Sequence, residues 1–98
     1  LYKELEILID DHFNNNQLLK DFTATPKDIK ERWFLHNNNF SISYIRKVLK
    51  DEMKCKILPM QRYVAFEDNA ITKKTGTPFI FYRKTQIVEN EEDSDVPF

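Results

Sequence analysis

The stretch FSISYIRKVLKDEMK, residues 40–54, has the pattern of an amphipathic helix. Ser41 can cap this helix, because its hydroxyl accepts a backbone N–H that has no intrahelical partner. Phe40 before the cap and Ile45 after it fit a hydrophobic staple. The apolar side of the helix consists of Ile42, Ile45, Val48, Leu49 and Met53. The opposite side carries Ser43, Arg46, Lys47, Lys50 and Lys54 and is basic. A solvated surface helix has the same pattern, so the flanking sequence decides the interpretation.

A second helix is predicted directly before this one. Thr25 can cap it, Pro26 suits its first position, and Asp28 stands where a capping box has its acid. We expect it to extend to about His36, and three consecutive asparagines, residues 37–39, then form a turn. Two helices joined by a short polar turn, the second with a basic outer face, predict a helix-turn-helix.

The N-terminal part of the chain predicts a further amphipathic helix over residues 1–13. An asparagine run, residues 14–16, ends it, and residues 17–22 are expected to form an apolar link with one helical turn. The chain begins at Leu1 within a helical pattern, which indicates either a piece of a longer protein or a numbering that omits the start.

The spacing of apolar residues no longer fits a helix after residue 54. Residues 57–60 are expected to form a connector or a short edge strand, and residues 62–66 and 78–83 are rich in aromatic and β-branched side chains. The polar residues 67–77 between them predict a β-hairpin with a long basic loop. Three helices followed by this hairpin predict an α+β winged helix over residues 1–88, with the loop as the wing and residues 85–88 extending the last strand. Residues 89–98 are expected to be a disordered acidic tail.

Charge is distributed unevenly along the 98 residues, although the net charge is only −1. Residues 25–88 hold 13 Lys and Arg against 6 Asp and Glu, whereas residues 89–98 hold 5 acids and no base. This split favours a polyanionic partner. The length suits one small domain. The single cysteine, Cys55, the absence of a signal peptide and the absence of a long apolar run favour a reducing, cytoplasmic location without a membrane.

The sequence holds no pattern of catalytic residues. His12 and His36 fall on different helices and are expected to be surface or partly buried side chains, not metal ligands. Gly76 is the only glycine, which excludes a glycine-rich phosphate loop. We therefore expect no enzymatic activity, no cofactor and no metal.

The sequence does contain residues suited to binding DNA. The side chains predicted to contact DNA are Lys27, Lys30, Ser43, Tyr44, Arg46, Lys47, Lys50, Arg62, Lys73, Lys74 and Arg83. Tyr44 is expected to stack on a base or to cover a phosphate. Tyr63 and Tyr82 are either stacking platforms for single-stranded DNA or core residues. Trp33, Phe66, Phe79 and Phe81 are expected in the core.

Two segments carry a family resemblance. The second helix contains KERWFLHNN, residues 30–38, and a late strand reads TGTPFIFYRK, residues 75–84. Together with the Ser-started third helix, they resemble the carboxy-terminal winged helix of replication helicase-primases of the poxvirus and phage-satellite type. They are also similar to small winged-helix single-stranded DNA-binding proteins of staphylococcal mobile elements. The resemblance implies a role in replication.

The last residues, DSDVPF, resemble the acidic tip of bacterial single-stranded DNA-binding proteins. In that family the terminal Phe enters an apolar pocket on replication and repair enzymes. The resemblance implies that Val96, Pro97 and Phe98 anchor a replication or repair partner. The steering charges would be Glu91, Glu92, Asp93 and Asp95. The rest of the chain lacks the succession of strands of their OB-fold.

These observations predict a DNA-binding module, preferentially for single strands, in the replication of a phage or mobile genetic element. Its acidic tail is expected to recruit a replication partner, and a homo-oligomer on DNA is compatible with the sequence. The alternative is a winged-helix adaptor between proteins, tethered to a helicase or primase, with little DNA binding of its own.

Overall fold

The computed structural model describes residues 1–67 and 73–83, which form mostly helices in the first half and mostly short antiparallel strands in the second. In chain order the elements are α1 (Tyr2–Asn14), β1 (Asp21–Ala24), α2 (Pro26–Trp33), α3 (Ile42–Lys47), the π-helical turn η1 (Val48–Glu52), β2 (Lys56–Ile57), β3 (Gln61–Tyr63), β4 (Lys74–Gly76) and β5 (Phe79–Tyr82). The α+β class is therefore confirmed. The middle of the predicted wing loop, the extension of the last strand over residues 85–88 and the acidic tail lie outside the described residues.

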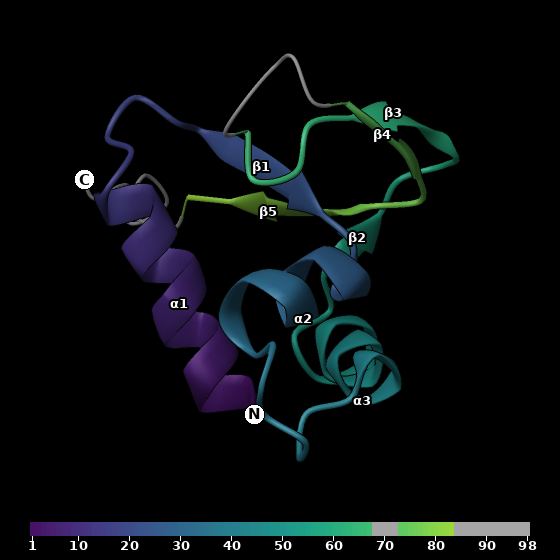
Figure 1. The fold of residues 1–98 in the computed structure, drawn as a ribbon. Helices are drawn as coiled ribbons and strands as arrows, with labels where there is room; N and C mark the ends of the chain where they lie inside the picture. The colour runs from purple at the N-terminus through teal and green to yellow at the C-terminus, as the bar shows by residue number, and fades with distance from the viewer. Residues whose placement is uncertain (68–72, 84–98) are drawn as a thin grey trace, which may run out of the picture.

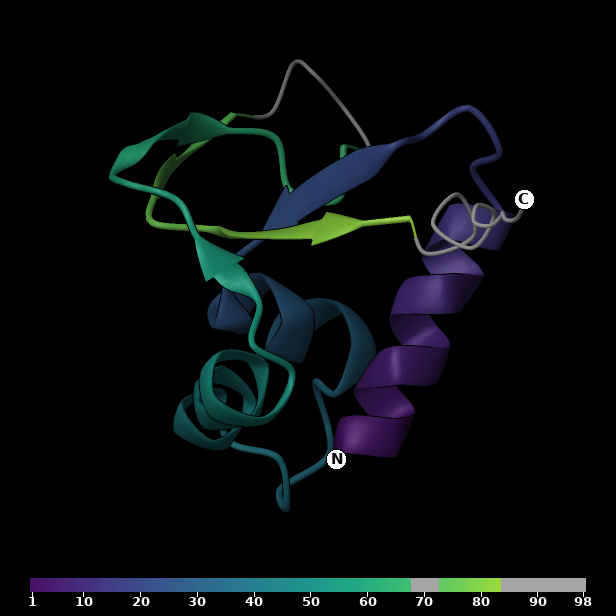
Figure 2. The same ribbon diagram turned by 180° about the vertical axis from the view of Figure 1, so that it is seen from behind.

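The strands form two small sheets. In the first, β5 lies between β1 and β2 and is antiparallel to both, with Phe22 opposite Phe81. In the second, β3 pairs with β4. The predicted hairpin between residues 62–66 and 78–83 was therefore wrong. Strand β5 carries buried rings of the core and pairs with β1 and β2, while β3 pairs with a strand inside the segment that was expected to be the loop. Figures 1 and 2 show the three helices on one side of the first sheet, with α1 at one end and the β3–β4 hairpin projecting from the other end. None of the described helices is long and apolar enough to cross a membrane.

Strand β1 replaces the helical turn that was expected in the link between the first two helices, so that prediction was wrong. Thr25 precedes Pro26, and the proline ring disfavours the helical region for the residue before it. Thr25 is indeed extended, with φ −89° and ψ 164°. The four residues of β1 pair with β5 along their whole length, which satisfies backbone groups that are mostly buried here.

The predicted helix starts of α2 and α3 are confirmed. The Thr25 hydroxyl accepts the Asp28 N–H at 3.2 Å, and the Asp28 carboxylate accepts the Thr25 N–H at 3.0 Å, which completes a capping box. The Ser41 hydroxyl accepts the Tyr44 N–H at 3.1 Å. Both caps depend on residues three apart in the chain, so the local sequence was sufficient to predict them.

The helix ends differ from the prediction. Helix α2 ends at Trp33 and not near His36, because Phe34 leaves the helical region with φ −131° and ψ 29°. After Lys47 the α-helix widens into η1, where the Met53 N–H donates to the Val48 carbonyl at 2.9 Å. Lys54 follows in a left-handed conformation, with φ 57°, and so lies beyond the helix in which it was placed. Ile42, assigned to the apolar side, is 44% exposed.

Phe22 of β1 is the centre of the core. Its ring is fully buried and lies 4.5 Å from His12, 5.1 Å from Phe13 and 5.0 Å from Phe81, measured between ring centroids. It thereby joins α1, β1 and β5. Phe66, Phe79 and Phe81 are buried as predicted, and Trp33 packs against this cluster while partly exposed. His12 is 7% exposed, so its prediction as a surface or partly buried side chain was wrong.

The segment after β3 turns back into this core. Phe66 and Glu67 both have positive φ, 59° and 54°, a conformation that costs about 1–3 kcal/mol per residue for side chains other than glycine. Two hydrogen bonds hold Phe66 in this conformation. The Phe66 N–H donates to the Thr23 carbonyl at 2.8 Å, and the Phe66 carbonyl lies 2.9 Å from His12 Nε2. Burial of the Phe66 ring, stacked on Phe22 at 5.7 Å, offsets the strain.

We expect Phe22→Ala to lower the free energy of unfolding by about 3–5 kcal/mol, because it removes a fully buried ring and leaves a cavity. Leu18→Ala is the matched control, since Leu18 lies four residues earlier and is 97% exposed. Urea unfolding followed by circular dichroism measures both. Equal stability of the two variants would contradict the placement of Phe22 at the centre of the core.

Candidate nucleic-acid interface

The exposed surface of α3 and η1 carries three cations, Arg46, Lys47 and Lys50, which we call the cationic face. The opposite side of the same helix is buried, with Ile45 and Leu49 at 0% exposure, so the orientation of the helix is fixed by its apolar residues. None of the three cations forms an ion pair with another described residue. No described acid therefore occupies these three side chains.

Four further residues from the predicted DNA-contacting set are also exposed. Lys27 lies in the first turn of α2, Ser43 on α3, Arg62 on β3, and Lys73 directly before β4. The cations among them have no hydrogen-bond or ion-pair partner among the described residues. They extend the set of available positive charges from α3 to the start of α2 and to the hairpin.

Three other predicted contacts are already occupied inside the protein. Lys30 Nζ donates to the Asn37 carbonyl at 2.5 Å, and Lys74 Nζ donates to Asp28 Oδ1 at 2.6 Å. The Arg83 guanidinium donates to the carbonyl oxygens of Asn16 and Leu19, at 2.9 and 2.7 Å, and covers the Phe13 ring. These three cations brace the fold, and contact with a phosphate would compete with those bonds.

Asp28 connects α2 to the β3–β4 hairpin. Its side chain is 4% exposed and accepts hydrogen bonds from the Tyr63 hydroxyl at 2.5 Å and from Lys74, in addition to its capping bond. Burial alone raises the pKa of the Asp28 carboxyl, but the bonds from Lys74, from the Thr25 backbone and from Tyr63 outweigh burial and hold that pKa below its usual value. The hairpin is thus fixed to the start of α2 by a buried, fully bonded carboxylate.

The three tyrosines considered as stacking platforms are in different environments. Tyr63 is 8% exposed, and burial together with the Asp28 carboxylate raises its pKa to about 12, so of its two predicted alternatives it is the core residue and not the platform. Tyr82, at the end of β5, is 58% exposed. Tyr44, on the helix of the cationic face, is 40% exposed and contacts the partly buried Phe40.

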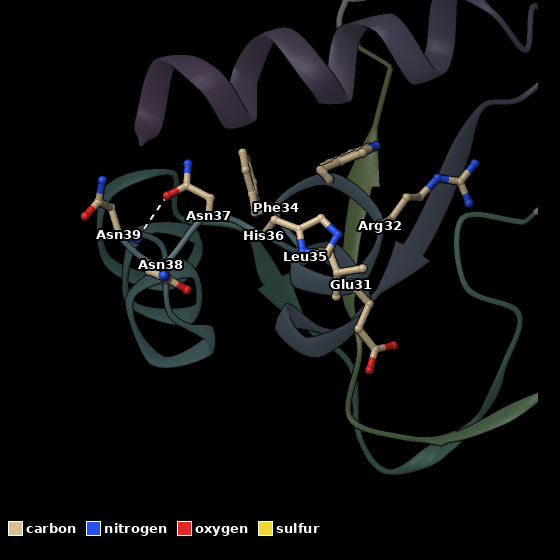
Figure 3. A pocket seen from close by; sticks show the side chains of 9 residues that line it. Glu31, Arg32, Phe34, Leu35, His36, Asn37, Asn38 and Asn39 are labelled. Carbon is tan, nitrogen blue, oxygen red and sulfur yellow. Dashed lines mark hydrogen bonds between the residues drawn. The ribbon is translucent and has the colours of Figure 1, made fainter.

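An open hollow of about 880 Å³ lies beside the turn between α2 and α3 and is lined by residues 31–39. Figure 3 shows Phe34 directed towards α1, while Leu35 and His36 lie on the outside of the turn. Asn37 holds the turn together, since its Oδ1 accepts the Asn39 N–H at 2.9 Å and its carbonyl accepts Lys30. The three asparagines therefore make a fixed turn rather than a loose linker.

The arrangement presents unpaired cations, exposed amides and a partly exposed aromatic ring, which suits binding of a polyanion that carries flat bases. Among residues 1–67 and 73–83, no three His, Cys, Asp or Glu side chains come together as metal ligands. The predicted partner-binding residues of the tail are outside the described part of the chain. Comparison of the sequence and structure with protein-family models, curated proteins and solved structures gives no match.

We expect Asp28→Asn to lower the free energy of unfolding by about 1–3 kcal/mol at pH 7, because it removes the charge that Tyr63 and Lys74 bind. Since the pKa of Asp28 is lowered in the folded protein, its contribution is complete above its usual pKa of about 3.9 and disappears as the pH falls through the folded value. Urea unfolding at pH 7 and pH 3 measures the change.

Asp51→Asn is the control, because Asp51 is an exposed acid of η1 whose removal should alter stability little at either pH. The difference in the free energy of unfolding between Asp28→Asn and wild type should shrink from pH 7 to pH 3. A difference that stays constant would contradict an electrostatic role for the carboxylate.

Proposed function

We propose that this domain is a winged helix that binds DNA through the cationic face of α3 and η1. The element order, with a strand between α1 and α2, three helices and then a hairpin, supports a winged helix, as does the position of β5 between β1 and β2. The observation that carries the proposal is the exposure of Arg46, Lys47 and Lys50 without an ion pair among the described residues.

In this proposal α3 and η1 face the DNA, and the cations of this face neutralise phosphates. Each neutralised phosphate releases condensed counterions, which makes binding depend on salt. The exposed Arg62 and Lys73 place further charge on the β3–β4 hairpin, which takes the part of the wing. The exposed carboxylates of Asp51 and Glu52 follow Lys50, so the cationic face itself covers about one and a half helical turns.

The biological setting rests on the sequence. The resemblance of residues 30–38 and 75–84 to replication winged helices supports action in the replication of a phage or mobile genetic element. The acids and the terminal Phe of residues 89–98 support recruitment of a partner protein. DNA binding and recruitment are separable parts of the proposal, because they are carried by different segments of the chain.

We expect the triple change of Arg46, Lys47 and Lys50 to Ala to weaken DNA binding at low salt. Loss of three phosphate contacts on a single strand reduces the slope of log K against log salt by about 2. Fluorescence anisotropy with a labelled oligonucleotide at several salt concentrations measures both quantities. Stability should change little, because the side chains are exposed.

The control is the double change of Lys3 and Lys20 to Ala, since both side chains are exposed and lie outside α3 and η1. An unchanged affinity and slope in the triple variant would contradict the assignment of the cationic face. Absence of salt-dependent DNA binding by the wild-type chain would instead favour a protein adaptor.

Removal of residues 89–98 is expected to leave DNA binding equal or make it tighter, most clearly at low salt. The segment contributes five acids and no base, and a tethered acidic segment competes with DNA at high effective concentration. The same truncation should abolish partner recruitment, and Phe98→Ala should reproduce most of that loss, because a buried aromatic anchor carries much of such an affinity. Pull-downs with the three forms measure recruitment. Recovery of the same proteins by all three would mean that the tail recruits nothing.

A further inference from the structure

We propose that Tyr44 is the stacking site for an unpaired base, so that the ligand of the cationic face is single-stranded DNA. The inference rests on the proposed function, since it specifies the form of DNA that the same helix takes. It starts from a row of three rings, Phe34, Phe40 and Tyr44, which we call the aromatic row.

The aromatic row extends from the core to the surface. Phe34 is 7% exposed, Phe40 is partly buried and Tyr44 is 40% exposed. The centroid of Phe40 lies 5.1 Å from that of Phe34, with the rings at 86°, and 6.0 Å from that of Tyr44, with the rings at 57°. Each ring therefore supports the next one outward, and the outermost ring is open to a ligand.

The platform is already formed in the unbound protein. The turn that leads into the row is held by the bond from Lys30 to the Asn37 carbonyl and by the bond from the Phe40 N–H to the same carbonyl at 3.3 Å. The Ser41 cap then fixes the backbone of Tyr44 itself. A ring held in this way loses little conformational freedom when a base stacks on it.

Residues that lie close to Tyr44 in the sequence carry the other groups that a nucleotide needs. Lys47 lies three residues further along the same helix, so it is adjacent to Tyr44 on the surface and can meet the phosphate of a stacked nucleotide. The exposed Asn38 and Asn39 come from the turn that precedes Phe40. Their amides carry both donors and acceptors, which suits the edges of an unpaired base.

A duplex cannot use this arrangement in the same way. In double-stranded DNA the base faces are covered by their neighbours, and a helix in the major groove meets only base edges. An exposed ring stacks readily on an unpaired base, whereas insertion into a duplex must first unstack a base step at a cost of about a few kcal/mol. The exposed acids Asp51 and Glu52 also limit how far α3 and η1 can follow a duplex with phosphates on both sides of the groove.

The test compares Tyr44→Phe, Tyr44→Leu and wild type by anisotropy on a labelled oligo(dT) and on a duplex of equal length. Tyr44→Phe keeps the ring and should bind like wild type. Tyr44→Leu keeps apolar bulk against Phe40 but has no ring, and should lose about 5- to 150-fold on the single strand, the range for one stacked base. Duplex binding should change less than twofold.

Tyr82→Leu is the matched control, because Tyr82 is even more exposed but lies at the end of β5, away from the cationic face. It should bind the single strand like wild type. A second measurement is photo-crosslinking of a 5-iodouracil oligonucleotide, where we expect the crosslinked peptide to contain Tyr44. Thermal unfolding of each variant establishes that the domain is folded.

Single-strand affinity of Tyr44→Leu equal to wild type would overturn the inference, and so would an equal loss on single strand and duplex. A crosslink to Tyr82 and not to Tyr44 would overturn it as well. In each of these cases salt-dependent binding by wild type would leave the proposed function intact. If the wild-type chain bound neither oligonucleotide, the proposed function itself would fail. Capture of a protein through Tyr44 without binding of oligo(dT) would assign the row to a protein partner and contradict the inference.

Discussion

The fold depends on the burial of one ring, Phe22, between elements that are distant in the sequence. Its contacts with His12 and Phe13 fix α1, its pairing opposite Phe81 fixes the register of the sheet, and its stacking on Phe66 brings the segment after β3 back to β1. Phe66 needs a strained backbone to reach this position, so contacts with the core fix the segment that follows β3. This packing also positions the elements of the candidate interface. Asp28 can join α2 to the hairpin only when both elements are packed in their folded positions.

A count of Lys and Arg in the sequence overestimates the number of cations at the candidate interface. Some of them form hydrogen bonds inside the protein, and others are exposed. Lys30, Lys74 and Arg83 donate to carbonyl or carboxylate oxygens inside the protein. The cations of α3 and η1 project from a helix whose opposite side is buried, and no acceptor in residues 1–67 or 73–83 bonds to them. The difference follows from burial, which sequence composition does not reveal.

The features that the sequence predicted are those decided by residues close together in the chain. The caps of α2 and α3 depend on partners three residues apart, and the basic side of α3 follows from helical spacing. The features it missed depend on distant partners. Strand β1 exists because β5 pairs with it, the Tyr63 hydroxyl donates to Asp28 from 35 positions away, and His12 is buried because Phe66, 54 positions away, covers it. No local pattern contains those pairings.

The size of the cationic face constrains how the proposed complex is stabilised. The three cations of the cationic face release few counterions, so the ionic part of the affinity that they contribute is modest and decreases as salt rises. Stacking does not depend on counterions, and one stacked base contributes about 1–3 kcal/mol at any salt concentration. The proposed complex therefore needs Tyr44 most when the charges are screened. The ratio of Tyr44→Leu to wild-type affinity on a single strand should then remain constant as salt increases, whereas the contribution of Arg46, Lys47 and Lys50 should diminish.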